Sequence, residues 1–165
     1  MKTQDNLKAA FAGESQANRR YLAYADQAMA DGYPEVAKLF RAVAAAETIH
    51  AHKHLRTLGE IKSTAENLEA ALAGENYEVQ VMYPDFMADA EAENAKQASL
   101  SFKYAWEAEK IHAGMFEQAR KMLGEEMEAA DYWICPVCGH THRGSEAPEK
   151  CPICGAKRER YFKVD

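Results

Sequence analysis

The chain contains an internal duplication that puts the same charged residue types at matching positions in two halves. Ala10-Phe11-Ala12-Gly13-Glu14 is answered by Ala71-Leu72-Ala73-Gly74-Glu75, and Glu47-x-x-His50 is answered by Glu109-x-x-His112. In each half the Glu-x-x-His pair follows the first glutamate at nearly the same distance. Duplication in a helix-rich chain is typical of two similar helical hairpins that pack together.

The hydrophobic pattern predicts four amphipathic helices, at about 5–30, 35–58, 63–89 and 95–123. Asp31-Gly32-Tyr33-Pro34 predicts a turn between the first two helices. Ser63-Thr64-Ala65-Glu66 has the pattern of a capping box and predicts the start of the third. Pro84 lies inside the third helix, where we expect a kink or a break.

The duplicated residues are metal-ligand types. A glutamate and a histidine three positions apart share one face of a helix and can bind one metal site. Ferritin-like di-iron bundles use one glutamate from each of two helices and a Glu-x-x-His from each of the other two. The chain supplies this set once, in the pairs Glu14 and Glu75, Glu47 and Glu109, His50 and His112. Carboxylates with imidazoles favour iron or manganese. Either residue type alone is usually solvated or structural, so the prediction depends on the shared register.

Glu78 breaks the symmetry of the duplication, because Ala17 stands at the equivalent position in the first half. Three residues after Glu75, it shares that residue's helix face. The predicted site therefore holds five carboxylates and two imidazoles. We hypothesise that oxidised iron binds the anionic Glu78 and reduced iron binds the neutral His50. A solvent-exposed Glu78 is the alternative.

Two tyrosines follow the first glutamate of each half. Tyr21 and Tyr83 lie seven and eight residues beyond Glu14 and Glu75, close to the same helix faces. Their hydroxyls are candidates to hydrogen-bond the ligand carboxylates. Buried tyrosines with other partners would give the same pattern, so both interpretations stay open.

The composition changes from Trp133 onward, where the chain becomes rich in Cys, Pro and Gly. Cys135-Pro-Val-Cys138-Gly139 and Cys151-Pro-Ile-Cys154-Gly155 form two knuckles, which predict a tetrahedral site of four thiolates. Zinc there would be structural, whereas iron would carry one electron. We favour iron, because a di-iron bundle needs an electron source. Trp133, Tyr161 and Phe162 are the expected core of this module, which needs its metal to fold.

Charge and composition exclude several classes of partner. The chain has 26 acidic and 20 basic residues and a formal net charge of −6, which favours neither nucleic acid nor an anionic membrane surface. No apolar run has the length of a signal sequence or a membrane span. All 4 cysteines are clustered near the end of the chain, which favours metal binding in a reducing cytoplasm over disulfides.

With these motifs in place, the chain resembles the rubrerythrin family over essentially its whole length. The matching stretches are Phe11-Ala-Gly-Glu-Ser-Gln-Ala17, Glu47-x-x-His50, Gly74-Glu75-x-x-Glu78, Met82-Tyr-Pro84, Ala108-Glu-x-x-His112 and the paired cysteine knuckles. The resemblance implies an all-α ferritin-like four-helix bundle at 1–130 and a small C-terminal rubredoxin-like metal-binding β domain at 131–165.

The resemblance also implies a function. It implies a cytoplasmic non-haem di-iron peroxidase that reduces hydrogen peroxide to water and protects against oxidative stress. Glu47 and Glu109 would bridge the irons. Glu14 with the Glu78 and His50 pair would serve one iron, and Glu75 with His112 the other. An Fe(Cys)4 centre at Cys135, Cys138, Cys151 and Cys154 would return electrons singly. The chain lacks a Gly-x-Gly-x-x-Gly motif after a strand, so we expect a separate reductase or rubredoxin to supply them.

The connection between the second and third helices predicts how the bundle is assembled. In a ferritin-like bundle these helices are parallel, so their connection must return along the bundle. A loop from Leu58 to Ser63 spans at most about 15 Å, whereas the return distance is about 30 Å. We therefore predict a homodimer with helices swapped between chains. The alternative is an unswapped bundle with a stretched loop at about 59–66.

Two other functions remain open from the sequence. A ferroxidase or other iron-handling protein would use the same helical ligands but would need no electron input. A non-enzymatic helical protein carrying a zinc ribbon would use neither iron site.

Overall fold

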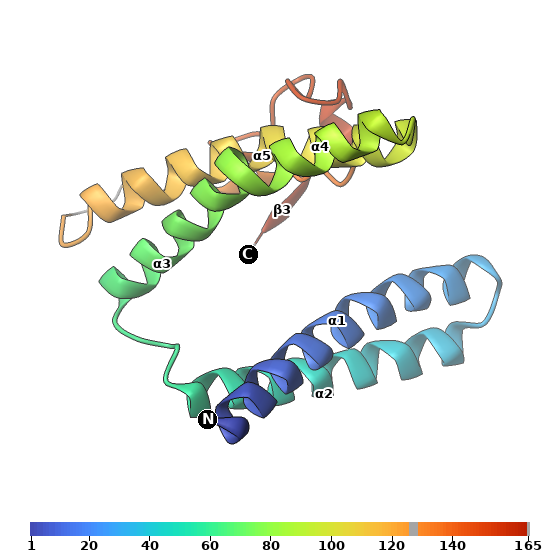
Figure 1. Cartoon of the computed structure of the whole chain (residues 1–165). Helices are drawn as coiled ribbons and strands as arrows, with labels where there is room; N and C mark the ends of the chain where they lie inside the picture. Colours follow the sequence, from blue (N-terminus) through green and yellow to red (C-terminus); the bar gives the residue numbers. More distant parts are fainter. Residues whose placement is uncertain (126–128, 165) are drawn as a thin grey trace. The chain divides into compact units, whose positions relative to one another are not determined.

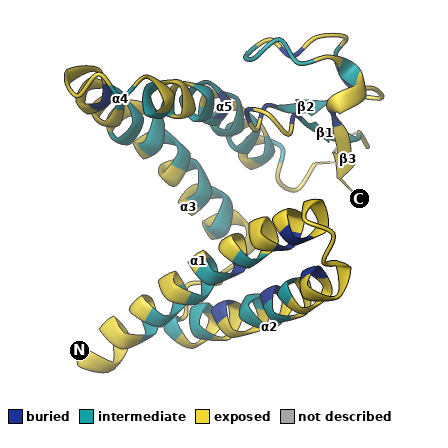
Figure 2. Ribbon diagram, turned by 90° about the vertical axis from the view of Figure 1, so that its right-hand side faces the viewer, coloured by how far each residue is buried: buried dark blue, intermediate teal, exposed yellow. Residues whose placement is uncertain are grey.

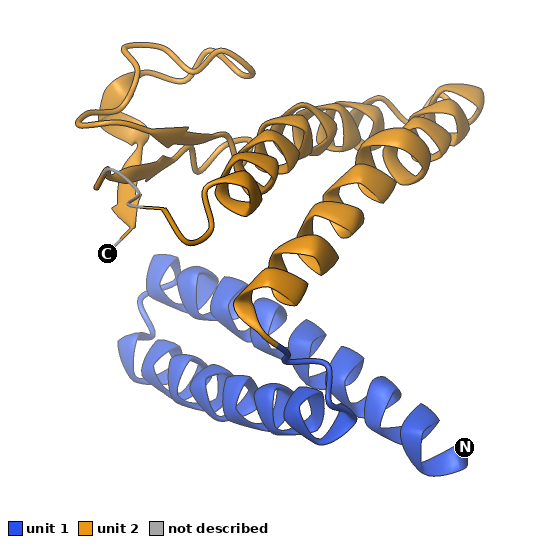
Figure 3. Ribbon diagram, turned by 90° about the vertical axis from the view of Figure 1, so that its left-hand side faces the viewer, with its two compact units in different colours: residues 1–62 blue, residues 63–165 orange. Residues whose placement is uncertain are grey.

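The computed structural model describes residues 1–125 and 129–164, and its chain divides into two compact units. Unit 1 comprises residues 1–62 and unit 2 residues 63–165 (Figures 1 and 3). Helical hairpins dominate both units, and a small sheet follows at the end of the chain, as the sequence predicted. The division into functional domains at residue 130 stays a prediction, and residues 126–128 just before it lie outside the described residues.

Unit 1 is a hairpin of two long helices, α1 (Lys2–Ala30) and α2 (Pro34–Leu58). Gly32 adopts a left-handed φ of 83° in the turn, and Pro34 begins α2 without losing a helical hydrogen bond. The buried contacts between the helices come from alanines, which allow close approach: Ala25, Ala28, Ala37, Ala44 and Ala51. Tyr21, Tyr24 and Phe40 form an aromatic cluster beside them.

Unit 1 also exposes large apolar side chains. Its two helices are mostly exposed or half-buried along their length (Figure 2). The exposed residues include Leu22, Met29, Val36, Leu39 and Ile49, the last with 69% of its surface accessible.

Asn18 is the one buried polar residue described in unit 1. Its side-chain amide on α1 donates to the Ala44 carbonyl at 2.7 Å and to the Thr48 hydroxyl at 2.8 Å, both on α2. Because an alanine interface offers little apolar area, this pair of hydrogen bonds fixes the register of the two helices.

Unit 2 begins with one long helical stretch made of α3 (Thr64–Tyr77), η1 (Glu78–Met82) and α4 (Tyr83–Ala92). The predicted capping box at its start is present, with Ser63 and Glu66 each accepting a hydrogen bond from the other's backbone amide. Helix α5 (Lys96–Lys121) returns along this stretch and packs against all three segments.

The effect of Pro84 is a wider turn rather than a break. Segment η1 is a π-helix, in which the Tyr83 amide donates to the Glu78 carbonyl five residues earlier. A π-turn makes room for the proline ring, which would clash with the carbonyl four residues before it in a regular helix. The change in the backbone hydrogen bonds of this segment leaves the Val79 carbonyl without its helical donor. The Trp106 indole on α5 donates to this carbonyl at 2.9 Å.

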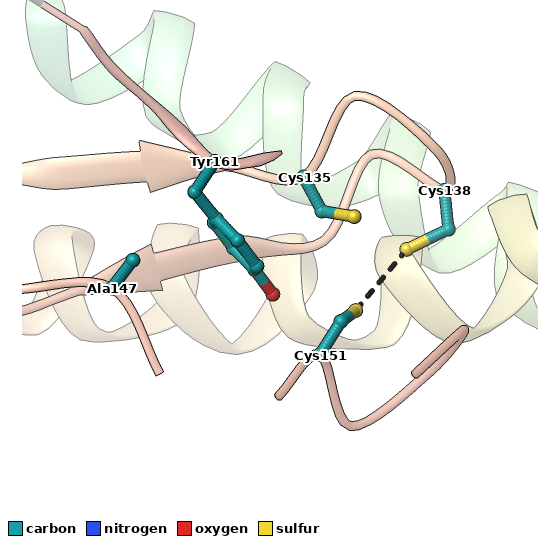
Figure 4. Packing of buried hydrophobic residues seen from close by; sticks show 5 residues of the cluster. All are labelled: Cys135, Cys138, Ala147, Cys151 and Tyr161. Carbon is teal, nitrogen blue, oxygen red and sulfur yellow. Dashed lines mark hydrogen bonds between the residues drawn. The ribbon is translucent and has the colours of Figure 1, made fainter. Parts of the chain in front are cut away.

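The end of the chain forms a three-stranded antiparallel sheet with strand order β2-β1-β3. Its strands are β1 (Tyr132–Ile134), β2 (Thr141–Arg143) and β3 (Phe162–Val164), and the 3-10 turn η2 (Arg158–Arg160) precedes β3. Tyr161 is buried among the cysteines (Figure 4). Trp133 packs against this cluster. Phe162 is 52% exposed, so its predicted core role is wrong. Because successive strand residues face opposite sides, an inward Tyr161 directs Phe162 outward.

Among the described residues, no helix combines the length and the hydrophobicity that a membrane crossing requires.

Replacement of Asn18 tests the register of the unit 1 hairpin. We expect Asn18→Ala to lower the free energy of unfolding by about 1–3 kcal/mol, because it removes two hydrogen bonds from a buried site. Urea unfolding of the full chain, followed by circular dichroism, measures this change. Arg20→Ala on the exposed side of α1 is the matched control and should change stability by less than about 0.5 kcal/mol. Equal effects of the two variants would contradict the role of Asn18.

Candidate metal centres

Unit 1 brings together three of the predicted ligands. Glu14 on α1 and Glu47 and His50 on α2 place ligand atoms within 4.8 Å of one another. The Nδ1 atom of His50 lies 2.9 Å from Glu47 Oε2 and 3.8 Å from Glu14 Oε1. The His50 side chain is 55% exposed, so this half-site lies at the surface of the hairpin.

Unit 2 repeats this arrangement with the duplicated residues. Glu75 on α3 and Glu109 and His112 on α5 also place ligand atoms within 4.8 Å of one another. His112 Nδ1 hydrogen-bonds Glu109 Oε2 and lies 3.9 Å from Glu75 Oε2. In both units the Nδ1 atom of the histidine faces two carboxylates. The duplicated residues therefore adopt the same local arrangement in each unit.

The unit 2 half-site concentrates negative charge in a partly buried place. Burial, followed by a hydrogen bond with Glu109, raises the pKa of Glu75 to about 7. The hydrogen bond between His112 and Glu109 lowers the pKa of Glu109 and raises that of His112. Glu75 Oε2 is buried and has no hydrogen-bond partner among the described residues. A carboxylate oxygen left unpaired beside a second carboxylate and an imidazole is suited to a metal cation.

Glu78 is the first residue of η1, next to this half-site rather than within its three-residue cluster. Burial raises the pKa of Glu78, and the charge of Glu109 raises it further while His112 opposes the change. Burial also raises the pKa of Tyr83, followed by the charges of Glu109, Glu78 and Glu75. Both side chains are therefore close enough to interact electrostatically with Glu109 of the half-site. Tyr21 lies in the aromatic cluster of unit 1. The ligand role of Glu78 and the supporting roles of the tyrosines stay predictions.

The four cysteines of unit 2 form a single cluster. Their sulfur atoms all lie within 4.8 Å of one another, with 3.6 Å between Cys135 and Cys154 and 3.5 Å between Cys138 and Cys151. These separations are too long for disulfides and close to the edge of about 3.8 Å expected for a tetrahedron with metal–sulfur bonds of about 2.3 Å. The sulfurs of Cys135, Cys138 and Cys151 are directed into a common space beside Tyr161 (Figure 4).

Each knuckle has the same backbone geometry. Gly139 and Gly155 have φ of 78° and 76°, and their amides donate to the carbonyls of Cys135 and Cys151 at 3.0 Å. The left-handed conformation turns the following backbone amides toward the sulfurs. Accordingly, the amide of His140 hydrogen-bonds Cys138, and the amide of Ala156 hydrogen-bonds Cys154.

Cys151 is the thiol best prepared to ionise. Burial raises its pKa, but hydrogen bonds from the Cys154 amide and the Tyr161 hydroxyl outweigh burial and bring the pKa to about 6. The Tyr161 hydroxyl also lies 2.7 Å from Nδ1 of the buried His140. The sequence analysis placed Tyr161 only in the apolar core and missed this polar role. The sequence contains no signal for the pairing, because the two residues meet only when β1 and β3 are joined.

The comparisons with known proteins agree with this geometry. The rubrerythrin family profile matches residues 5–120, and the profile for the rubredoxin-like domain of rubrerythrin matches residues 133–162. The chain belongs to the rubrerythrin family. Its helical ligands fit a di-iron centre, and its cysteines fit a mononuclear Fe(Cys)4 centre.

Individual relatives cover nearly the whole chain. Rubrerythrin-2 of Clostridium acetobutylicum is 37% identical and matches 96% of this chain and 95% of its own. Nigerythrin of Nitratidesulfovibrio vulgaris is 35% identical over 96% of this chain and 85% of its own. The structure of fully reduced, all-ferrous nigerythrin matches with a TM-score of 0.60 at 35% identity, covering 98% of this rubrerythrin-family chain and 86% of nigerythrin. These matches confirm the predicted ferritin-like fold with a rubredoxin-like module.

The raised pKa of Glu75 predicts how metal binding depends on pH. Because Glu75 is protonated below about 7, a metal ion must displace its proton there, so the affinity should fall as the pH drops from 8 to 6. His112, whose pKa is also raised, acts in the same direction. Calorimetric titration of Fe(II) into the full chain, with the cysteine site already loaded, counts the protons released.

The difference between wild type and Glu75→Gln isolates the contribution of Glu75. At pH 6 the variant should release about one proton fewer per Glu75-containing site. Glu69→Gln, at an exposed position of α3, is the matched control and should release as many protons as wild type. Equal proton counts for all three proteins would show that Glu75 binds no metal.

Proposed function

We propose that this protein is a non-haem di-iron peroxidase that reduces hydrogen peroxide to water with electrons delivered through its Fe(Cys)4 centre. The observation that carries the proposal is the coexistence of two Glu, Glu, His half-sites and a four-cysteine site in one chain. The first type suits a pair of iron ions, and the second suits one-electron transfer. Protection of cytoplasmic components against peroxide is the corresponding biological role.

The half-sites supply the ligands of the di-iron centre. Glu47 and Glu109 are the proposed bridging carboxylates, since each hydrogen-bonds the histidine of its own half-site. Glu14 with His50 or Glu78 would complete one iron site, and Glu75 with His112 the other. When bound, two neighbouring ferrous ions supply both electrons for cleavage of the peroxide bond at one place.

The two histidines of the proposed site differ in exposure. The side chain of His50 is 55% exposed, whereas that of His112 is 25% exposed. His50 therefore has the space to move away from the carboxylates, and the anionic Glu78 is the proposed replacement when the site carries more positive charge. Tyr83, close to three carboxylates, is positioned to hold one of them by a hydrogen bond.

The four-cysteine site distinguishes this proposal from its alternatives. A ferroxidase takes electrons from its substrate iron and has no use for a one-electron donor. A structural zinc-ribbon protein would have no reason to collect carboxylates and histidines in two matching clusters. The peroxidase uses both kinds of site, with a separate reductase or rubredoxin as the external electron donor.

Stopped-flow mixing of the reduced protein with peroxide or with oxygen tests the proposal. We expect oxidation by equimolar peroxide to be at least about tenfold faster than by oxygen, as transition-state complementarity to peroxide requires. The double variant Cys135→Ser, Cys154→Ser should keep this first oxidation and lose multiple turnovers, because its electrons are no longer replaced. Faster oxidation by oxygen, or undiminished turnover without the cysteines, would support a ferroxidase instead.

We also propose that the di-iron sites form in a helix-swapped homodimer, in which α1 and α2 of one chain meet α3–α5 of the other. Helix α2 ends at Leu58 and α3 starts at Thr64, so six Cα steps of at most about 3.6 Å can span about 22 Å. To align His50 with Glu75 on parallel helices of one chain, the connection must cover about 28 Å along the axis. Gly59, with its left-handed φ of 73°, shortens the connection further.

The exposed apolar side chains support this assembly. Leu39 and Ile49 of unit 1 are 62% and 69% exposed, and Tyr77 and Val81 of unit 2 are 57% and 43% exposed. Burial against a second copy would remove this area from water.

Complementation between two inactive variants tests the swap. One variant carries Glu47→Ala and His50→Ala, and the other carries Glu109→Ala and His112→Ala. In a swapped heterodimer one site receives both intact halves, so co-refolded protein should recover about half of the wild-type helical iron sites among heterodimers. Each variant refolded alone is the control and should bind no iron pair. An unswapped bundle would show no recovery, because every site would keep one damaged half.

A further inference from the structure

The cysteine module contacts α5 along one stripe of that helix, and strand β2 lies beside α5 (Figure 2). Residues at intervals of four share a helix face, and three such residues meet the module. Tyr104 packs against the cysteine cluster, Ala108 lies under Gly139, and His112 reaches Thr141. A Cβ atom on Gly139 would lie 4.0 Å from the Ala108 Cβ, so two small residues allow the backbones to approach.

This contact joins the two metal-ligand clusters of unit 2 by hydrogen bonds. His112 Nε2 lies 2.8 Å from the Thr141 hydroxyl, which in turn donates to the Gly139 carbonyl at 3.3 Å. Gly139 directly follows the ligand Cys138. The connection from Cys138 to His112 therefore runs through the backbone of Gly139 to its carbonyl, and then through two hydrogen bonds with the Thr141 hydroxyl between them.

The directions of these hydrogen bonds agree with a metal-binding imidazole. Without a metal, His112 Nδ1 carries the proton of its hydrogen bond to Glu109; a metal ion bound beside Glu109 and Glu75 would take the Nδ1 lone pair in place of that proton. The proton of the neutral ring then lies on Nε2 and is donated to the Thr141 oxygen. Thr141 uses its own proton for the Gly139 carbonyl, so neither donor competes with the other.

The duplicated half-site has no equivalent of this support. Within unit 1, His50 Nδ1 faces Glu47 and Glu14 in the same manner, but no hydrogen bond to its Nε2 is present among the described residues of that unit. The two histidines thus have similar partners at Nδ1 and different surroundings at Nε2. The difference arises from Thr141 together with the Gly139 carbonyl, which also accepts from His112.

We propose that Thr141 is a positioning residue that fixes the His112 ring and provides the route by which electrons pass from the cysteine centre to the iron ion that His112 binds. The proposal rests on the proposed function. In the transfer, one electron leaves a ferrous ion held by the cysteines, which becomes ferric, and reduces a ferric ion held by His112. No covalent bond is made or broken, and an external reductase restores the ferrous state.

Exchange of the His112 Nε2 proton with solvent tests the positioning role without catalysis. In the full chain loaded with zinc at both kinds of site, this proton should exchange slowly in wild type and in Thr141→Ser. In Thr141→Val, which keeps the shape and lacks the hydroxyl, exchange should be roughly tenfold faster. The Gly139 carbonyl also accepts from His112, so the variant should retain part of the protection. The Nε2 proton of His50 is the internal control and should be unchanged.

The rate of internal electron transfer tests the route. After fully reduced iron-loaded protein is mixed with peroxide, the red colour of the ferric cysteine centre appears at that rate. Thr141→Val should slow this phase by roughly tenfold, in the range typical for loss of a ligand's hydrogen-bond partner. Thr141→Ser should restore it, and the preceding oxidation of the di-iron site by peroxide should be unchanged. Thr57→Val, which removes an exposed hydroxyl on α2, is the matched control.

The outcomes separate this inference from the proposed function. Absence of the peroxide phase in wild type would refute the peroxidase and leave the proton-exchange test valid. A normal peroxide phase with no effect of Thr141→Val on either readout would refute the role of Thr141. Failure of Thr141→Ser to restore both readouts would assign the effect to packing and also refute it. If Thr141→Val does not retain metal in the cysteine site, the smaller Thr141→Ala replaces it in both measurements.

Discussion

Carboxylates held close together on facing helices repel one another, and in a partly buried place water screens that repulsion poorly. In unit 2, burial, followed by a hydrogen bond with Glu109 and then by the charge of Glu109, raises the pKa of Glu75 to about 7. A cation resolves the conflict by giving every carboxylate a partner. The helices of this protein therefore surround a place that requires a metal cation, which the chain itself does not supply. Because each cluster of carboxylates needs such a cation, the ligands are duplicated as a complete set.

The scaffold holds these ligands with few large core residues. In unit 1, alanines and the Asn18 hydrogen bonds set the distance between α1 and α2. In unit 2, the π-turn that accommodates Pro84 begins at Glu78, next to the ligand cluster. Glu78 shares the helix face of Glu75 through its three-residue spacing, and Tyr83 directly follows the π-turn. The charge of Glu109 acts on both side chains. The second half-site thus has a neighbouring carboxylate, Glu78, where the first half has Ala17.

The cysteine module introduces a further asymmetry into a duplicated design. Its knuckles bind a metal through local geometry that needs only glycine and backbone amides. Its position on α5, however, is set by Tyr104, Ala108 and His112, which share one face of that helix. One histidine of the pair is thereby fixed on its outer side while the other is largely exposed. A symmetric ligand set thus acquires one supported imidazole and one that is largely exposed.

The sequence alone determined those features that depend on local spacing. The i, i+3 ligand pairs, the capping box at Ser63 and the glycines of the knuckles follow from helix period and backbone sterics, and the structure confirms their local geometry. Only the tertiary structure decided the π-turn before Pro84, the outward side of Phe162 and the hydrogen bond between His112 and Thr141. These features depend on which surfaces meet, and residues 29 positions apart leave no periodic signal of their contact.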